Sequence, residues 1–344
     1  SRGLGDVYKR QDIVRTKDFS LGISATYNYN HNNIDELADN IIAQYGSQWA
    51  SSATTPTYDY EFREGKPVGL VRGYICDGFY TTADFNYDPA TQMYTLKEGV
   101  ADLGTQVGNY PSHYNLPDGQ KAFPGAIKLR DLDGNGVADT DDVTDLGEIT
   151  HPHTGGFNLN MTWKDIDFSA GFAWAAGGHV YNVNSLINMY GNKDTGAGAN
   201  KLSFISDCYQ IYDIQNGELV PVVEPSALDA LNAGAKYGVP YMENGTVLST
   251  FVEDASFLRL NTLTIGYTFP KAWTKKIGMQ RARIYATAGN LFTITGYSGI
   301  DPEVNADPNK STTAANTGGY PMLGMDYGTY PRARTFTFGV NIAF

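Results

Sequence analysis

Apolar and polar residues alternate with a period of two along several stretches of the chain, most clearly near its end. Within residues 334–344, Phe336 and Phe338 fall on one side, and Thr335 and Thr337 fall on the other. This alternation predicts a β-strand, because successive side chains of a strand point to opposite faces of a sheet. The same pattern predicts strands in the ranges 19–30, 156–163, 166–176, 257–269 and 282–295.

One of these runs contains a residue that interrupts the pattern. Ile284, Ala286, Ala288 and Phe292 share a face in 282–295, but the polar Asn290 stands on the same face. We therefore predict a strand there and note Asn290 as a misfit.

The length and chemistry of the runs favour strands that cross a membrane. A tilted spanning strand needs about 9–11 residues. One face of each run is apolar, and the other is small and mostly uncharged. This division suits a barrel wall with lipid outside and a filled or watery lumen inside. A soluble strand packed on a core shows the same alternation, so the pattern by itself leaves both fold classes open.

The connections between the runs differ greatly in length. The links at 164–165 and 270–281 are short, whereas 31–155, 177–256 and 296–333 are long. If residue 344 lies at the periplasmic end, every short link is periplasmic and every long one is extracellular, as in outer-membrane barrels. We place the apolar run 67–80 in the first extracellular loop, because counting it as a spanning strand breaks this order.

Composition narrows the classes of function. Aromatic residues make up 13% and charged residues 18% of the 344-residue chain, and Gly is abundant at 38. This composition suits a β-rich protein, either a barrel or a secreted sandwich or propeller. The net charge of −12 argues against a nucleic-acid partner. Two separated cysteines, Cys76 and Cys208, indicate neither a zinc site nor a disulfide framework.

The beginning of the chain does not follow the strand pattern. Residues 1–11, SRGLGDVYKRQ, neither alternate nor form an apolar segment. We expect them to be a non-native or disordered leader, and residues 12–344 to be the folded part.

Several stretches together resemble the SusC/RagA-like TonB-dependent transporters of Bacteroidetes. They are GYICDGFY (73–80), FPGAIKLRDLDGNGVADTDD (123–142), GGFNLNMTWKDIDFSAGFAWAAGGHVYN (155–182), EDASFLRLNTLTIGYTFP (253–270), ARIYATAGNLFTITGYSGIDPEVN (282–305) and TFTFGVNIAF (335–344). Their order and spacing match the C-terminal third of that family.

The resemblance implies an all-β fold: the C-terminal strands of a plugged antiparallel β-barrel of about 22 strands in the outer membrane. It also implies TonB-dependent uptake of oligosaccharides, or of peptides, together with a SusD-like surface lipoprotein. On this reading the chain is a fragment that lacks the plug, contacts outer-membrane lipid and is not an enzyme.

Residues 131–142, DLDGNGVADTDD, match the start of an EF-hand-type calcium loop. The spacing wraps several oxygens around one ion, and Gly136 provides the sharp turn at the sixth position. Asp142 stands where a bidentate Glu is usual, which predicts weaker binding of Ca²⁺. The expected ligands are Asp131, Asp133, Asn135, the carbonyl of Val137, Asp139 and Asp142.

Other candidate sites carry weaker signals. His151 and His153 are a possible metal pair, although such pairs are more often loop residues. Trp49, Tyr190 and Tyr241 lie in the long loops and suit either stacking on sugars or anchoring at a membrane surface. Two further functions stay open: a soluble calcium-dependent glycan-binding β protein, and a glycan hydrolase that uses two carboxylates on one cleft.

Overall fold

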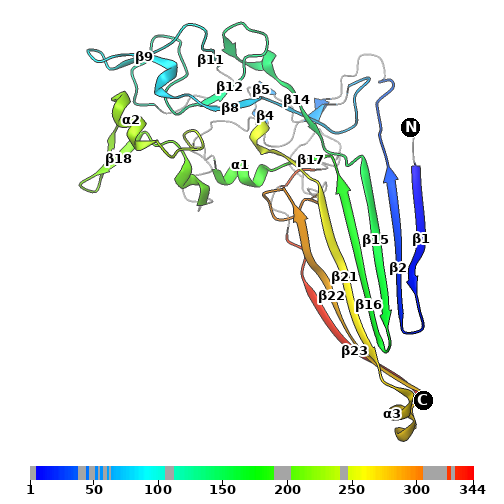
Figure 1. Ribbon diagram of the computed structural model, residues 1–344. Coiled ribbons are helices and arrows are strands. Elements are labelled where there is room, and N and C mark those ends of the chain that lie inside the picture. The colour runs from blue at the N-terminus through cyan, green and yellow to red at the C-terminus, as the bar shows by residue number, and fades with distance from the viewer. Residues whose placement is uncertain are drawn as a thin grey trace.

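One large sheet and a folded head at one end of it make up the structure, a computed structural model (Figure 1). The head consists of the described parts of 31–152, 177–256 and 296–334. We call the opposite end of the sheet the turn end. The structure describes residues 5–37, 44–45, 51–52, 55–56, 60–61, 63–104, 112–189, 203–240, 247–304, 324–326 and 330–344.

The sheet has seven strands, and every neighbouring pair is antiparallel. The strands follow one another in chain order across the sheet, a meander in which each strand pairs with the next of the seven. In that order they are β1 (Gly5–Arg15), β2 (Phe19–Tyr29), β15 (His153–Trp163), β16 (Ile166–Ala176), β21 (Phe257–Thr268), β22 (Arg281–Thr295) and β23 (Thr335–Ala343). Six of these strands correspond to the six predicted runs.

The first strand, β1, corrects the expectation of a disordered leader for residues 5–11. These residues pair with β2 from Gly5 opposite Tyr29 to Gln11 opposite Ile23. The side chains of residues 5–11 do not alternate. These residues still form a strand, because any residue with a free backbone N–H and C=O can pair with the edge of a sheet, here β2.

A β-bulge explains two residues that strict alternation misplaces. Asn261 is an extra residue of β21 relative to its neighbours, and the register of β22 shifts beside it. Counting back from Leu263 in steps of two puts Arg259 on the apolar face. The bulge instead places Arg259 opposite Ala173, on the polar face. The misfit Asn290 lies in the same irregularity with a positive φ of 51°, a conformation that Asn tolerates.

The first two long connections fold into short elements, whereas the described part of the third contains no helix or strand. The first contains β3 (Gln44–Tyr45), β4 (Ser51–Ser52), β5 (Thr55–Pro56), β6 (Tyr60–Glu61), β7 (Leu70–Gly73), β8 (Cys76–Phe79), η1 (Thr82–Asp84), β9 (Phe85–Asp88), β10 (Met93–Leu96), β11 (Asp102–Leu103), β12 (Ile127–Leu129), β13 (Val137–Ala138), η3 (Thr140–Asp142) and β14 (Thr144–Glu148). The second contains β17 (His179–Tyr181), α1 (Val183–Met189), η4 (Ser203–Asp207), β18 (Tyr212–Gln215), β19 (Glu218–Pro221), α2 (Pro225–Leu231), η5 (Ser249–Phe251) and β20 (Val252–Asp254). The run 67–80 supplies β7 and β8 of this head.

A core of aromatic and aliphatic side chains holds the head together. Tyr80, Tyr94 and Phe123 are completely or almost completely buried there, and Leu248 joins them from the second connection. Tyr181 of the second connection also bridges to Met325 of the third. The long connections therefore share one core and support one another.

The turn end is small by comparison. A two-residue turn at 164–165 joins β15 to β16. The link between β21 and β22 contains only α3 (Lys271–Thr274) and η6 (Lys275–Ile277). Long connections thus gather at one end of the sheet and short ones at the other (Figure 1).

Among the described residues, no helix is both long and apolar enough to cross a membrane.

Candidate functional site

The two faces of the large sheet differ sharply in chemistry, and the apolar face is exposed. Ile265 in the middle of the sheet is 50% exposed, and Phe338 on β23 is 80% exposed. Monomeric soluble proteins rarely expose a continuous apolar face of this extent. No core forms on this side of the described sheet, so the apolar side chains point outward, as the sequence pattern predicts for a membrane wall.

The opposite, polar face lines a groove of about 850 Å³. Hydroxyl and amide side chains dominate it, and Thr264 and Thr287 on the same face hydrogen bond to each other at 2.9 Å. From β2, β15, β16 and β21 the groove is lined by Ser20, Ser24, Asn158, Asn160, Thr162, Ser169, Asn261 and Thr262. This face suits water or a polar filling, not hydrocarbon.

Aromatic side chains border the apolar face near both ends of the strands. At the head end, Tyr27 stacks on Trp174 with ring centroids 6.1 Å apart, and its hydroxyl lies 2.7 Å from Nδ1 of His153. At the turn end, Phe19 pairs with Trp163 across the sheet. Tyr27 and Phe19 are eight residues apart on β2, ~27 Å along an extended strand. An apolar band about 25 Å tall between aromatic girdles is typical of outer-membrane barrels.

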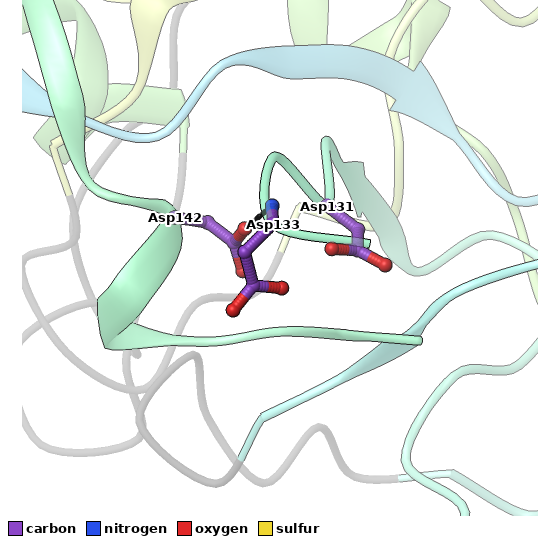
Figure 2. Close-up of side chains that lie close together, drawn as sticks. All are labelled: Asp131, Asp133 and Asp142. Carbon is purple, nitrogen blue, oxygen red and sulfur yellow. Dashed lines mark hydrogen bonds between the residues drawn. The ribbon is translucent and has the colours of Figure 1, made fainter. Parts of the chain in front are cut away.

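The predicted calcium loop is an acidic loop between β12 and β14, in the head. Ligand oxygens of Asp131, Asp133 and Asp142 lie within 4.8 Å of one another (Figure 2). The backbone N–H groups of Gly134 and Gly136 donate to Asp131 at 2.7 and 2.8 Å. The bond from Gly136 is the main cause of a lowered pKa of Asp131. The loop thus brings three carboxylates together.

Asp142 is the buried member of this cluster, with 0% of its surface exposed. It accepts hydrogen bonds from the N–H groups of Leu132 at 2.5 Å and Asp139 at 2.8 Å. Oδ1 also accepts from the N–H of Asp133 at 3.3 Å, whereas Oδ2 accepts the single bond from Asp139 and keeps a lone pair for a cation. Three clustered carboxylates without a nitrogen or sulfur ligand fit a hard ion such as Ca²⁺.

The other three predicted ligands form hydrogen bonds or strand pairs of their own. The carboxylate of Asp139 accepts from the N–H of Asp141 and caps η3, and Asp139 is not part of the three-carboxylate cluster. The side-chain oxygen of Asn135 accepts from the N–H of Val137 at 2.8 Å. Val137 itself begins β13, which pairs in parallel with β11. Of the four predicted carboxylate ligands, three therefore lie together, and Nδ2 of Asn135 donates to one of them, Asp133, at 3.1 Å.

Sequence reasoning missed Tyr74, which lies beside this loop. Its side chain is only 2% exposed, and its hydroxyl has no hydrogen-bond partner among the described residues. Burial, with smaller contributions from Asp139 and Asp142, raises the pKa of Tyr74 to about 12. Tyr74 is 57 residues before Asp131, so no local motif connects the two.

The weaker candidates do not form a site in the described part of the chain. Nε2 of His151 lies 3.1 Å from the carbonyl oxygen of Ala255, and His153 contacts Tyr27 instead. Neither histidine belongs to a metal-binding cluster of the described residues. Trp49, Tyr190 and Tyr241 lie outside the described residues.

Comparison with known proteins agrees with this geometry. The chain is 28% identical over 331 residues to TonB-dependent receptor P3 of Formosa agariphila, a match that covers 96% of the chain. It is 24% identical over 339 residues to TonB-dependent receptor SusC of Bacteroides thetaiotaomicron, again over 96% of the chain. The chain is a relative of the SusC/RagA-like TonB-dependent transporters. The resemblance predicted from its sequence motifs is confirmed.

Solved structures of SusC/RagA-like proteins share the fold. The structure of the RagAB peptide transporter matches 98% of the chain with a TM-score of 0.61 at 20% sequence identity. The RagAB peptide importer in its closed-closed state matches 97% with a TM-score of 0.60. The predicted all-β architecture of an antiparallel barrel wall is therefore confirmed. No protein-family model matches the chain.

The match covers only part of each relative. The chain spans 27% of the length of the Formosa receptor and 25% of SusC. The activity, substrate and partners of a whole transporter are therefore matters of proposal.

Proposed function

We propose that the chain is part of the wall of an outer-membrane barrel that takes up oligosaccharides or peptides in a TonB-dependent manner. The observation that carries this proposal is the exposed apolar face of the seven-stranded sheet, bordered by aromatic residues at both ends. Burial of that face in hydrocarbon stabilises the protein, since each Å² of apolar surface removed from water contributes about 25 cal/mol. The polar face then borders the transport path.

The relatives suggest the rest of the machinery. In an outer-membrane transporter of this type, we expect a SusD-like surface lipoprotein to contact the head and TonB to supply energy through parts outside this sequence. The head end is then extracellular and the turn end periplasmic. We expect no covalent chemistry on the substrate, so the chain acts in binding and passage and is not an enzyme.

The polar face is compatible with two classes of substrate. RagAB is described as a peptide transporter. An oligosaccharide substrate is instead implied by the resemblance of the sequence to SusC/RagA-like transporters. Both classes are rich in hydrogen-bonding groups, and the hydroxyl and amide side chains of the polar face suit either.

The function is tested in the native host by deleting the gene and measuring uptake of labelled oligosaccharides and peptides. We expect the deletion to abolish uptake of one class, and the wild-type gene, but not one with the apolar-face change Ile265→Arg, to restore it. Recovery of the wild-type protein in the soluble fraction, together with unchanged uptake, contradicts the proposal. That result favours the soluble calcium-dependent glycan-binding protein instead.

We further propose that the acidic loop binds Ca²⁺ and thereby stiffens the head. Asp131, Asp133 and Asp142 supply the carboxylates, and the chemistry of the ion is structural. Mutual repulsion of three carboxylates within 4.8 Å falls when a divalent cation lies among them. The unpartnered, buried hydroxyl of Tyr74 beside the loop supports a site whose hydrogen bonding is completed on binding.

Isothermal titration of the intact protein with CaCl₂ tests this second proposal. We expect heat of binding for the wild type, none for Asp131→Asn combined with Asp133→Asn, and unchanged heat for the control Asp213→Asn on β18. Absence of heat with the folded wild-type protein contradicts a calcium site and leaves the transport proposal unaffected.

A further inference from the structure

A strongly basic segment connects β21 and β22 at the turn end. We call residues 270–281, PKAWTKKIGMQR, the basic turn. It contains Lys271, Lys275, Lys276 and Arg281 and no acidic residue. No acidic residue occurs anywhere between Asp254 and Asp301, although the whole chain carries a net charge of −12. The basic turn is therefore positively charged within a protein that is negatively charged overall.

The charged side chains of the basic turn are free to bind a partner. Lys271, Lys275, Lys276 and Arg281 are exposed, and none of them forms an ion pair with another described residue. By contrast Arg283, two positions further on, is neutralised by Asp167 through a hydrogen bond of 2.8 Å. The positive charge of the basic turn is thus not neutralised by an ion pair within the described part of the chain, whereas that of Arg283 is.

Two large apolar side chains accompany these cations. Trp273 is 60% exposed and Ile277 is 65% exposed, and they are four residues apart on the helical α3–η6 segment, which places them on one side. Thr274 between them is buried, and the N–H of Met279 donates to its carbonyl oxygen at 3.0 Å. The fold therefore holds Trp273 and Ile277 outward instead of allowing them to collapse onto the sheet.

The basic turn lies where the apolar face ends. Figure 1 shows α3 beyond the ends of the strands, and the N–H of Gln280 donates to the carbonyl oxygen of Ala343 on β23 at 2.8 Å. On the neighbouring turn, Nζ of Lys164 lies 5.8 Å from the ring of Trp163, which belongs to the aromatic border of the apolar face. Tryptophan beside lysine at the edge of an apolar surface is the arrangement found at the level of lipid headgroups.

We infer that the basic turn binds the phosphate groups of anionic phospholipids in the adjoining membrane leaflet. This inference rests on the proposed membrane-wall function. The lysines meet the headgroup phosphates while Trp273 and Ile277 enter the acyl boundary, as basic and apolar residues do together in interfacial segments. An acidic protein partner would supply negative charge, but it would not supply an acyl-chain boundary in which the exposed Trp273 and Ile277 are buried.

The test uses the intact protein reconstituted into nanodiscs of phosphatidylcholine with or without phosphatidylglycerol, with bound lipids counted by native mass spectrometry. We expect the wild type to retain phosphatidylglycerol over phosphatidylcholine. Neutralising Lys275 and Lys276 to Gln should weaken this preference roughly fivefold for each lysine. The matched control, Lys97→Gln with Lys236→Gln on the head, should keep the preference of the wild type.

A second variant separates the apolar contribution from charge. Trp273→Ala should reduce retention of both lipids equally and leave the preference unchanged. Equal retention of the two lipids by a correctly inserted wild type overturns the inference, and so does an unchanged preference in the lysine variant. Failure of the wild type to insert into any bilayer overturns the membrane-wall function as well, so the two failures are distinguishable.

Discussion

Arg259 and Asp301 form a buried ion pair that ties the sheet to the third long connection. Nη2 of Arg259 lies 2.6 Å from Oδ1 of Asp301, and their side chains are only 2% and 8% exposed. Nε of Arg259 also donates to Thr293 at 3.0 Å. The pair exists because the bulge at Asn261 turns Arg259 onto the polar face, where a charge can be neutralised.

Replacing Arg259 with Met should destabilise the protein by about 3 kcal/mol, because it leaves a buried carboxylate without its main partner. Arg332, 3.4 Å from Asp301, limits the loss. Urea unfolding followed by tryptophan fluorescence measures the change. Arg130→Met is the control: its pair with Asp77 is half exposed, so the loss should be much smaller. Equal losses in the two variants would show that burial of the Arg259 pair is unimportant.

Asn290 should tolerate Gly better than Val. Its φ of 51° disfavours a β-branched residue by about 1–2 kcal/mol, whereas Gly adopts it freely. Both changes remove the same hydrogen bond, from Nδ2 of Asn290 to the carbonyl oxygen of Arg332 at 3.0 Å. The difference in unfolding free energy between Asn290→Val and Asn290→Gly therefore reports the cost of the positive φ at this position. A Val variant as stable as the Gly variant contradicts the bulge geometry.

Gly266 leaves room for Arg283 to reach Asp167 from two strands away. A Cβ at position 266 would lie 2.6 Å from Cζ of Arg283. Gly266→Ala should therefore cost about 1–3 kcal/mol by overpacking. Gly234→Ala, in open space, should stay within about 0.5 kcal/mol. In an Arg283→Ala background, the loss of stability caused by Gly266→Ala should disappear. If that loss persists, a clash with Arg283 does not explain it.

Acid should loosen the acidic loop through Asp131. Hydrogen bonds from Gly136 and Gly134 lower its pKa in the folded state. Its stabilising contribution is therefore complete above the unfolded pKa of about 3.9 and is lost as pH falls through the lower folded pKa.

Pepsin cleavage of the loop next to the exposed Leu132, measured with a chelator present, follows this loss. Asp131→Asn should be cleaved faster than the wild type above about pH 4 and approach it at lower pH. The control Asp141→Asn should behave as the wild type. Identical cleavage of wild type and Asp131→Asn across the whole range contradicts the role of these hydrogen bonds.

Period-two alternation predicts the sheet well because each of these strands repeats one simple division between an apolar and a polar face. The exceptions have local causes. Alternation cannot place Arg259 or explain Asn290, since a bulge adds a residue without a mark in the hydrophobic pattern. Residues 5–11 form a strand through backbone pairing, which side-chain patterns do not record.

The head and the acidic loop show a different limit of sequence reasoning. Strands of two to five residues, such as β11 and β14, are too short to show a periodic pattern. The shared core of the head therefore could not be predicted from the sequence. Local spacing does predict the cluster of Asp131, Asp133 and Asp142. The structure adds that the carboxylate of Asp139 caps η3 and that Tyr74, which local spacing cannot find, lies near the loop.

The most direct test of a membrane wall compares two adjacent positions of β21. Ile265→Cys and Thr264→Cys, each spin-labelled in the intact protein within a lipid bilayer, report on the apolar and the polar face. We predict that dissolved oxygen, which concentrates in hydrocarbon, relaxes the label at 265 strongly and the label at 264 weakly. A label at 265 that is shielded from oxygen, with a label at 264 that is exposed to it, contradicts the account.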